Sequence, residues 1–162
     1  SLIQRWPKDF RSYAERRLAA AQPPATPMDG AALVTALYER VWSQGEETAV
    51  KELVAPTYEI FSDPGDAWEG KRLDRAEYWQ RVLYSRTAFP DLRFELHELL
   101  SDGDRVSARW SAEGTQEGDL DGLPATGKRL RFAGQTIYRI QEGKVAGHWQ
   151  VVDRLGFVQQ LG

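Results

Sequence analysis

The chain has 162 residues, a formal net charge of −3 and no cysteine, which suits one soluble domain with a substantial core. The acidic balance excludes a basic surface for nucleic acid, and the lack of cysteine excludes disulfides, thiolate metal sites and cysteine nucleophiles. Two histidines cannot build a histidine-rich metal site, and no apolar run suits a membrane span or a secretion signal, so we expect a cytoplasmic protein.

The first segment predicts a helix outside the main domain. Residues 9–21 carry apolar side chains at helical spacing, and a proline-rich linker follows. We therefore expect residues 1–28 to form a helical extension, which packs either on its own domain or on a second subunit. Residues 29–162 are expected to form the compact domain.

Three helices are expected at the start of the compact domain. The first lies between Asp29, an N-cap, and Gly45, and the second ends before Pro56. The third begins at Asp74, which fits a capping box with Glu77. Its expected buried face is Ala76, Trp79, Val82 and Leu83. The turn that precedes this helix contains two acids, Asp63 and Asp66, interpreted as ordinary turn residues.

After residue 90 the apolar period changes from 3.6 to 2. Long strands are expected on both sides of an Asp102-Gly103 hairpin turn, followed by a glycine-rich loop over residues 117–128 and a further strand. Inward positions on these strands include Trp110 and Thr136. The pattern predicts an α+β domain, in which a cone-shaped, curved antiparallel sheet wraps around three helices and leaves one open mouth.

The last predicted strand carries its polar, potentially catalytic side chains on one face. Alternation puts His148, Gln150 and Val152 on the face toward the interior, and Trp149 and Val151 on the other face. A proton-transfer group thus stands beside an amide on a rigid element. The following Asp153 is interpreted either as the N-cap of a final helix or as a base at the mouth of the cone.

Five stretches together resemble the SnoaL-like polyketide cyclase family of the nuclear transport factor 2-like superfamily. They span residues 31–162 in order: Leu37–Gly45, Leu53–Tyr58, Phe89–Phe94, Gly122–Lys128 and Gly143–Gly162. The resemblance implies a cone with an apolar pocket and an intramolecular aldol reaction that uses no metal and no cofactor. In the family an acidic residue after a His-Trp pair removes a proton beside a carbonyl.

This sequence departs from that pattern at three positions. Gln150 follows His148-Trp149 where the resemblance implies an acid, and an amide accepts no proton at neutral pH. Gln116 stands where relatives often have a histidine, and Phe61 where a histidine or asparagine is common. The implied pocket is less acidic than that of a working cyclase.

The candidate site therefore combines proton-transfer groups with an aromatic pocket. His148 would shuttle a proton, with Asp153 as its orienting group or as the base. A structural, hydrogen-bonded histidine is the alternative interpretation of His148, and core packing is the alternative for the aromatic residues. The expected substrate-binding residues are Tyr38, Trp42, Phe61, Trp79, Trp110, Gln116, Thr136 and Gln150. Tyr38 and Gln150 would polarise a carbonyl group.

Three functions compete on this reading. The first is a cofactor-free cyclase or isomerase acting on a small hydrophobic carbonyl or polyketide compound. The second is a non-catalytic ligand-binding or dimerisation module that has lost the acid at Gln150. The third, an epoxide-opening hydrolase, needs two acids flanking a buried arginine, whereas Arg109 and Arg139 are expected on outer faces. Trp149 and Val151 on the outer sheet face predict a homodimer.

Overall fold

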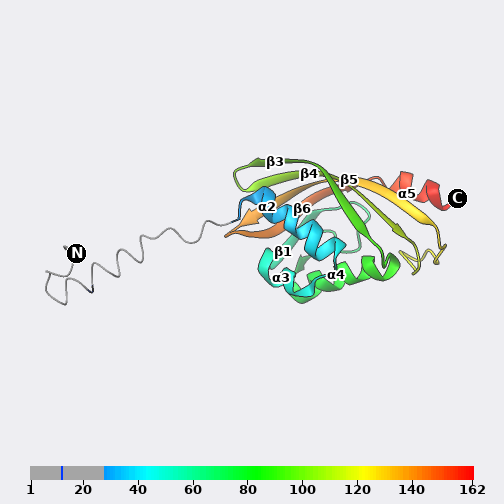
Figure 1. Cartoon of the computed structure of the whole chain (residues 1–162), viewed down its shortest axis with the longest axis horizontal. Helices are drawn as coiled ribbons and strands as arrows, with labels where there is room; N and C mark the ends of the chain where they lie inside the picture. Colours follow the sequence, from blue (N-terminus) through cyan, green and yellow to red (C-terminus); the bar gives the residue numbers. More distant parts are fainter. Residues whose placement is uncertain (1–11, 13–27) are drawn as a thin grey trace.

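One curved sheet of six strands organises the molecule (Figure 1). The computed structural model describes residues 12 and 28–162, so the expected helical extension lies outside the described residues apart from Ser12 and Met28. The strands are β1 (Val54–Ser62), β2 (Arg72–Leu73), β3 (Arg93–Asp102), β4 (Arg105–Thr115), β5 (Arg129–Gln141) and β6 (Lys144–Val152). Their spatial order is β2-β1-β6-β5-β4-β3.

The α+β fold class is confirmed, with one refinement in the sheet. Neighbouring strands pair antiparallel, except that β1 runs parallel to β6 and places Ile60 opposite His148. In the sequence, β1 comes early in the domain and β6 is the last strand. The first long strand and the final strand are therefore direct neighbours at the centre of the sheet.

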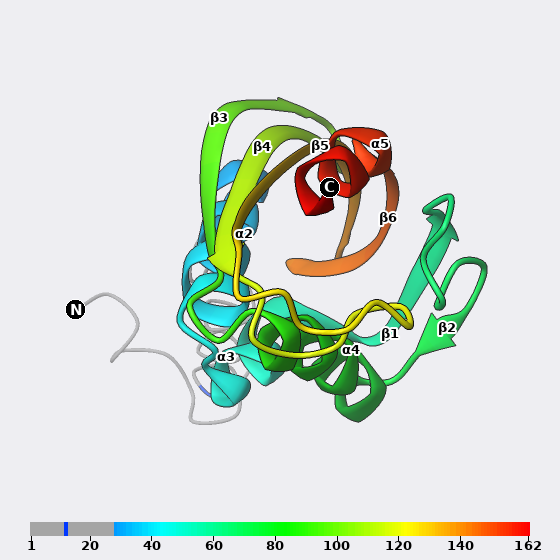
Figure 2. The same cartoon turned by 90° about the vertical axis from the view of Figure 1, so that its right-hand side faces the viewer.

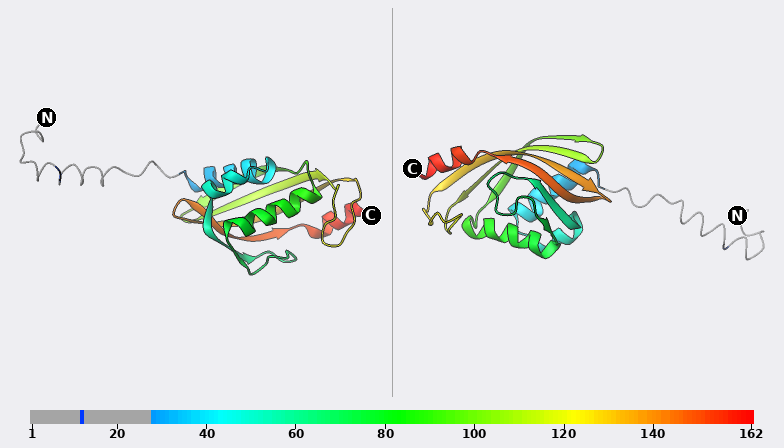
Figure 3. Two further views of the ribbon diagram at one scale, coloured as in Figure 1. Left: turned by 90° about the horizontal axis from the view of Figure 1, so that it is seen from below. Right: turned by 180° about the vertical axis from the view of Figure 1, so that it is seen from behind.

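Helices cover one side of the sheet, as the views in Figure 3 show. Over this side lie α2 (Gly30–Ala36), its π-helical continuation η2 (Leu37–Ser43), α3 (Glu47–Leu53) and α4 (Arg75–Ala88), while α5 (Arg154–Leu161) follows β6 at one end of the sheet. Asp29 caps α2 by accepting from the Ala32 N–H at 2.7 Å, and Asp74 and Glu77 form the predicted capping box of α4. None of the helices in residues 28–162 has both the length and the apolar character needed to cross a membrane.

The buried face of α4 differs from the prediction. Tyr78, Arg81 and Val82 face the interior, whereas Ala76 is exposed and Leu83 is 36% exposed. The sequence pattern misassigned the face because it treats arginine as a surface residue. Arg81 is buried because two carboxylates receive its guanidinium, which offsets the cost of removing the charge from water.

The concave side of the sheet surrounds an aromatic interior. Along β4 the inward residues Val106, Ala108 and Trp110 are buried, as the period of two predicts. Figure 2 looks onto the end of the molecule where α5 and the loop over residues 117–128 lie, and shows the strands curling around the space above α4. The sheet and the helices thus form the expected cone.

The outer face of the sheet carries a stacked pair of aromatic rings. Phe61 stacks on Trp149 with ring centroids 4.2 Å apart, and Arg139 lies over the Phe61 ring. Val151, on the same face of β6 as Trp149, is 68% exposed. The homodimer through this face stays a prediction.

Gly134 lies where β5 passes behind Trp110. A Cβ atom at this position would meet Trp110 Cζ2 at 2.4 Å and the Val151 carbonyl oxygen at 2.8 Å. We expect Gly134→Ala to lower the free energy of unfolding by about 1–3 kcal/mol, because the buried indole ring must shift. Urea unfolding measures this change.

The exposed neighbour Gln135 supplies the control for that variant. Gln135→Ala should change the free energy of unfolding by less than about 0.5 kcal/mol, as is usual for surface substitutions. Equal stability of Gly134→Ala and Gln135→Ala would contradict the proposed steric role of Gly134.

Candidate active site

A cavity of about 320 Å³ lies between the helices and the concave face of the sheet. Aromatic side chains make up much of its wall, and its polar lining includes Asp66, Arg81, His148, Gln150 and Arg154. This volume lies in the range of small-molecule sites, and the combination of apolar walls with a few convergent polar groups is typical of them. The cavity is the candidate site for a hydrophobic ligand.

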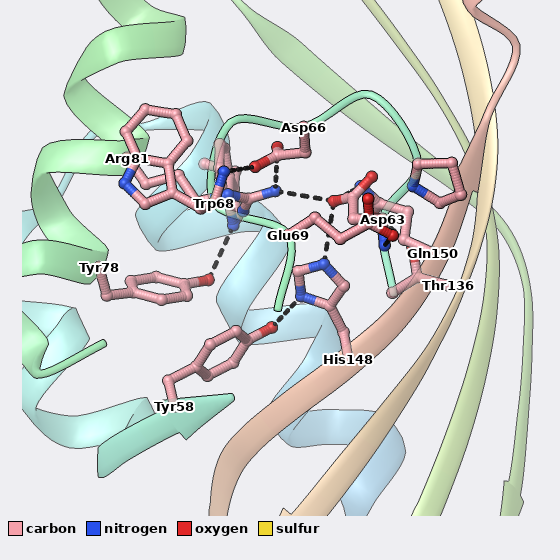
Figure 4. Close-up of polar contacts among 12 residues, drawn as sticks. Tyr58, Asp63, Asp66, Trp68, Glu69, Tyr78, Arg81, Thr136, His148 and Gln150 are labelled. Carbon is pink, nitrogen blue, oxygen red and sulfur yellow. Dashed lines mark hydrogen bonds and ion pairs between the residues drawn. The ribbon is translucent and has the colours of Figure 1, made fainter. Parts of the chain in front are cut away.

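Asp63 organises the polar end of this cavity (Figure 4). It comes directly after β1, and none of its surface is exposed. Its Oδ2 atom accepts from Arg81 Nη2 at 3.1 Å, from Gln150 Nε2 at 2.9 Å and from His148 Nε2 at 3.0 Å. Arg154 Nη2 lies 3.4 Å from the other oxygen. A buried carboxylate is stable here because each oxygen has donors.

The amide of Gln150 is held in one orientation by a chain of hydrogen bonds. Trp110 Nε1 donates to Thr136 Oγ1 at 2.8 Å, and Thr136 Oγ1 donates to Gln150 Oε1 at 2.7 Å. Gln150 Nε2 then donates to Asp63. The amide that replaces the expected acid on β6 is therefore in contact with a carboxylate from the end of β1, so the site does contain an acid.

His148 is a buried imidazole in the lining of the cavity. Its exposed fraction is 2%, and burial lowers its pKa from the usual value of 6.5, although the hydrogen bond to Asp63 opposes this shift. The ring also contacts Tyr58, whose hydroxyl lies 2.6 Å from Nδ1. A neutral histidine can accept a proton near neutral pH, which is the property that a general base needs.

Arg81 bridges two carboxylates. Its Nη2 atom donates to Asp63 Oδ2 at 3.1 Å and to Asp66 Oδ2 at 3.0 Å. Burial would raise the pKa of Asp66, but the charge of Arg81 and the N–H of Trp68 outweigh burial, so the pKa is lowered. The Nε–H of Arg81 is buried and has no hydrogen-bond partner within residues 28–162.

Five of the predicted site residues line the cavity. They are Tyr38, Trp42, Trp110, His148 and Gln150. Tyr38 also accepts a 2.7 Å hydrogen bond from the Tyr138 hydroxyl, so a second polar group stands in the aromatic wall. Burial raises the pKa of the Tyr38 hydroxyl, which keeps it protonated and able to donate.

The other five predicted residues lie outside the lining of this cavity. Phe61 points to the outer face because it stacks on Trp149, and Trp79 packs partly buried against the core. Thr136 lies behind the wall and orients Gln150. The two remaining residues serve the local backbone: Gln116 accepts from Thr126 Oγ1 at 2.7 Å and steadies the loop, and Asp153 caps α5 by accepting from Gly156 N–H at 2.8 Å.

Sequence reasoning missed Asp63, Arg81 and Tyr58. The interpretation of Asp63 and Asp66 as ordinary turn residues is wrong, since Asp63 is buried and both bond to Arg81. The sequence analysis disfavoured the epoxide-opening hydrolase because it expected no buried arginine between two acids. Arg81, between Asp63 and Asp66, shows that this expectation is wrong. One sequence signal could have indicated that Arg81 is buried: it lies three residues after Tyr78, on the same face of α4.

The turn that follows Asp63 contains a glycine in a left-handed backbone conformation. Gly65 has a φ of +88°, and a Cβ atom there would lie 2.7 Å from Arg154 Nε. The left-handed conformation therefore favours glycine here, and a side chain at this position would also require Arg154 to shift. Within residues 28–162 no three His, Asp or Glu side chains converge as a metal site does.

The curved sheet, the covering helices and the buried acid–histidine pair above an aromatic cavity define a class of small cone-shaped ligand-binding proteins and enzymes. Residues 32–161 match the profile of the SnoaL-like polyketide cyclase family, and the chain belongs to this family.

Individual relatives agree with this assignment. Aklanonic acid methyl ester cyclase DnrD of Streptomyces peucetius is 36% identical over 86 residues, which cover 52% of this chain and 55% of the relative. Aklanonic acid methyl ester cyclase DauD of Streptomyces sp. (strain C5) is 41% identical over 87 residues, which cover 52% of this chain and 50% of the relative. The matched part of the chain thus spans about half the length of these relatives.

Solved structures extend the likeness over more of the chain. A candidate polyketide cyclase from Acidithiobacillus ferrooxidans is 43% identical, with a TM-score of 0.75, and the match covers 80% of this chain and 91% of that protein. IdmH of Streptomyces antibioticus, described as a candidate polyketide cyclase, is 28% identical, with a TM-score of 0.69 and coverage of 85% and 99%.

The lowered pKa of His148 makes stability depend on pH. In the unfolded chain the imidazole takes up a proton near pH 6.5, whereas in the folded protein it does so only at lower pH. The unfolded state therefore binds more protons in this window, and stability falls as the pH drops below 6.5. We expect His148→Gln to lose less stability than the wild type between pH 8 and pH 5. The two slopes should differ by at most about 1.4 kcal/mol for each step of one in pH, the effect of a single proton.

Chemical denaturation at several pH values measures this difference. His97→Gln is the control, because it removes the other histidine and leaves the buried imidazole in place. It should keep the wild-type dependence on pH. If His148→Gln also keeps it, the buried imidazole is not the group responsible.

Proposed function

We propose that this protein is a cyclase that closes a ring in a hydrophobic polyketide ester by an intramolecular aldol reaction, with its own side chains as acid and base. The observation that carries the proposal is the buried His148, whose Nε2 atom lies 3.0 Å from Asp63 Oδ2 in the wall of an aromatic cavity. Membership of the SnoaL-like polyketide cyclase family and the names of the two Streptomyces cyclases support it.

The reaction would begin with removal of a proton from the carbon beside a carbonyl group. His148 is the net acceptor of this proton, and Asp63 stabilises the resulting imidazolium through the 3.0 Å contact with Nε2. The same contact keeps the ring in one orientation, as a carboxylate does for the histidine of a catalytic triad. Asp63 itself positions the base, because three donors already occupy its Oδ2 atom.

The negative charge that develops on the carbonyl oxygen needs donors. The Tyr38 hydroxyl, which burial keeps protonated, and the guanidinium of Arg81 both line the cavity and are the candidate donors. The enolate carbon then attacks the second carbonyl of the same molecule, which forms the carbon–carbon bond. The new alkoxide oxygen takes the proton back, so the site returns to its starting state.

The aromatic wall holds the substrate in a folded conformation. Trp42, Phe94 and Trp110 line the cavity with their rings in contact with one another. Such a wall favours a flat, conjugated ligand, and it holds the two reacting carbons close together. The site therefore contributes both proton transfer and proximity.

Aklanonic acid methyl ester is the probe for this proposal. We expect the wild-type protein to convert it to a cyclised isomer of unchanged mass, followed by liquid chromatography and mass spectrometry. His148→Gln should lower kcat by about 100-fold or more with little change in KM, since it removes the base and leaves the aromatic wall.

His97→Gln is the matched control, because His97 lies outside the cavity lining, and it should turn over at the wild-type rate. Wild-type kcat in His148→Gln would contradict the proposed role of the imidazole. Tight binding of the probe without turnover would favour the second function, a non-catalytic binding module.

A ring-opening hydrolase is a further candidate, favoured by one observation. Arg81 lies between Asp63 and Asp66, the arrangement of two acids and a buried arginine that such a reaction needs. Against it, the lowered pKa of Asp66 leaves this group as a base, and Asp63 Oδ2 is filled by donors, so neither acid is suited to protonate an epoxide oxygen.

Cyclohexene oxide in ¹⁸O-labelled water separates the two chemistries. A hydrolase would form a labelled diol at a rate that Asp66→Asn abolishes. We expect no diol above the uncatalysed rate, and enzymatic diol formation would replace the aldol proposal.

A further inference from the structure

Both ring nitrogens of His148 are engaged before any substrate arrives (Figure 4). Nε2 lies 3.0 Å from Asp63 Oδ2, and Nδ1 lies 2.6 Å from the Tyr58 hydroxyl oxygen. The carboxylate oxygen is an acceptor, so Nε2 carries the proton and donates. Nδ1 is then the unprotonated nitrogen, and the Tyr58 O–H donates to it.

This tautomer has a consequence for proton transfer. The only nitrogen of His148 that can take up a proton is Nδ1, and Tyr58 covers it. Turning the ring to expose Nδ1 would break the contact between Nε2 and Asp63 Oδ2. A substrate proton therefore reaches His148 through the tyrosine hydroxyl.

We propose that Tyr58, His148 and Asp63 form a proton relay in which Tyr58 is the residue that touches the substrate. The inference rests on the proposed cyclase function and adds a catalytic residue to it. Its geometric basis is the unbroken series of hydrogen bonds from Tyr58 to Asp63 and the place of Tyr58 in the cavity wall.

The relay moves two protons in one step. The Tyr58 Oη atom takes the proton from the substrate carbon while the Tyr58 O–H proton passes to His148 Nδ1, and the electron pair of the broken C–H bond stays on the substrate as an enolate. His148 becomes an imidazolium whose Nε2–H remains bonded to Asp63. After the carbon–carbon bond forms, Tyr58 donates its proton to the new alkoxide, and His148 returns its proton to Tyr58.

The surroundings of Tyr58 favour a concerted transfer. Burial raises the pKa of its hydroxyl well above 10, so a free tyrosinate does not accumulate. Edge-on contact with the Tyr78 ring, at 4.7 Å between centroids, holds the phenol in place. Simultaneous loss and gain of a proton lets the phenol act as a carrier without becoming an anion.

Tyr58→Phe is the direct test, because it removes the relay oxygen and keeps the ring. We expect kcat for aklanonic acid methyl ester to fall by about 100-fold or more, with KM nearly unchanged. His97→Gln is the control, because His97 lies outside the cavity lining and contacts neither Tyr58 nor Asp63. It should retain most of the activity.

Two outcomes separate this inference from the proposed function. If Tyr58→Phe turns over like the wild type while His148→Gln is inactive, the relay is wrong and the cyclase proposal stands. If both variants are as active as the wild type, or if no variant and no wild-type protein turns the probe over, both proposals are wrong.

Two measurements on the wild-type protein test the relay without relying on the folding of a variant. Nitrogen-15 NMR of the imidazole should show His148 protonated at Nε2 and unprotonated at Nδ1, and the opposite tautomer would overturn the relay. Turnover of a substrate deuterated at the reacting carbon should be slower in D₂O than in H₂O, because an exchangeable proton moves as the carbon–deuterium bond breaks. Equal rates in the two solvents would also overturn it.

Discussion

A single buried carboxylate oxygen links the polar side chains of the candidate site. Asp63 Oδ2 receives donors from α4 and from two residues of β6, and the loop after β1 carries it to the centre of the fold. Removing such a carboxylate would leave a guanidinium and an imidazole without their shared acceptor in a region that excludes water. Helix, strand and loop therefore depend on one another at this point, and the geometry of the candidate site follows from the same contacts that stabilise the fold.

The position of the acid shows how one site can be built in two ways. In the pattern that the resemblance implies, the acid follows the His-Trp pair on the last strand. In this chain Gln150 occupies that position and Asp63 supplies the carboxylate from the neighbouring strand, 2.9 Å from the amide nitrogen. The parallel pairing of β1 with β6 makes this exchange feasible, since it brings the end of β1 beside the middle of β6. In the proposed mechanism the acid acts on the histidine, while the substrate contacts the phenol and the arginine.

Much of the fold could be predicted because it depends on local signals. Asp29 and Asp74 start their helices as their side-chain chemistry predicts, and alternation placed His148 and Gln150 on the inner face of the last strand. The buried arginine could not be predicted in this way, because its burial depends on carboxylates 15 and 18 residues away. Phe61 was misplaced for a similar reason: its stacking partner, Trp149, lies on a strand that is distant in the sequence although adjacent in the sheet. Composition assigns a residue to surface or core on average, whereas a tertiary ion pair or stack decides the individual case.

The pairing of β1 with β6 also determines when the site comes into existence. Asp63 and His148 are 85 residues apart in the chain, and Tyr58 and His148 are 90 apart. Contacts that close such long loops are slow to form, because the entropy of the intervening chain must be lost first. The order of assembly during synthesis follows: a nascent chain can build its first helices and the β3–β4 hairpin well before His148 is available to meet Asp63. Catalytic competence would then appear only with the last strand, and would report that the whole domain has closed.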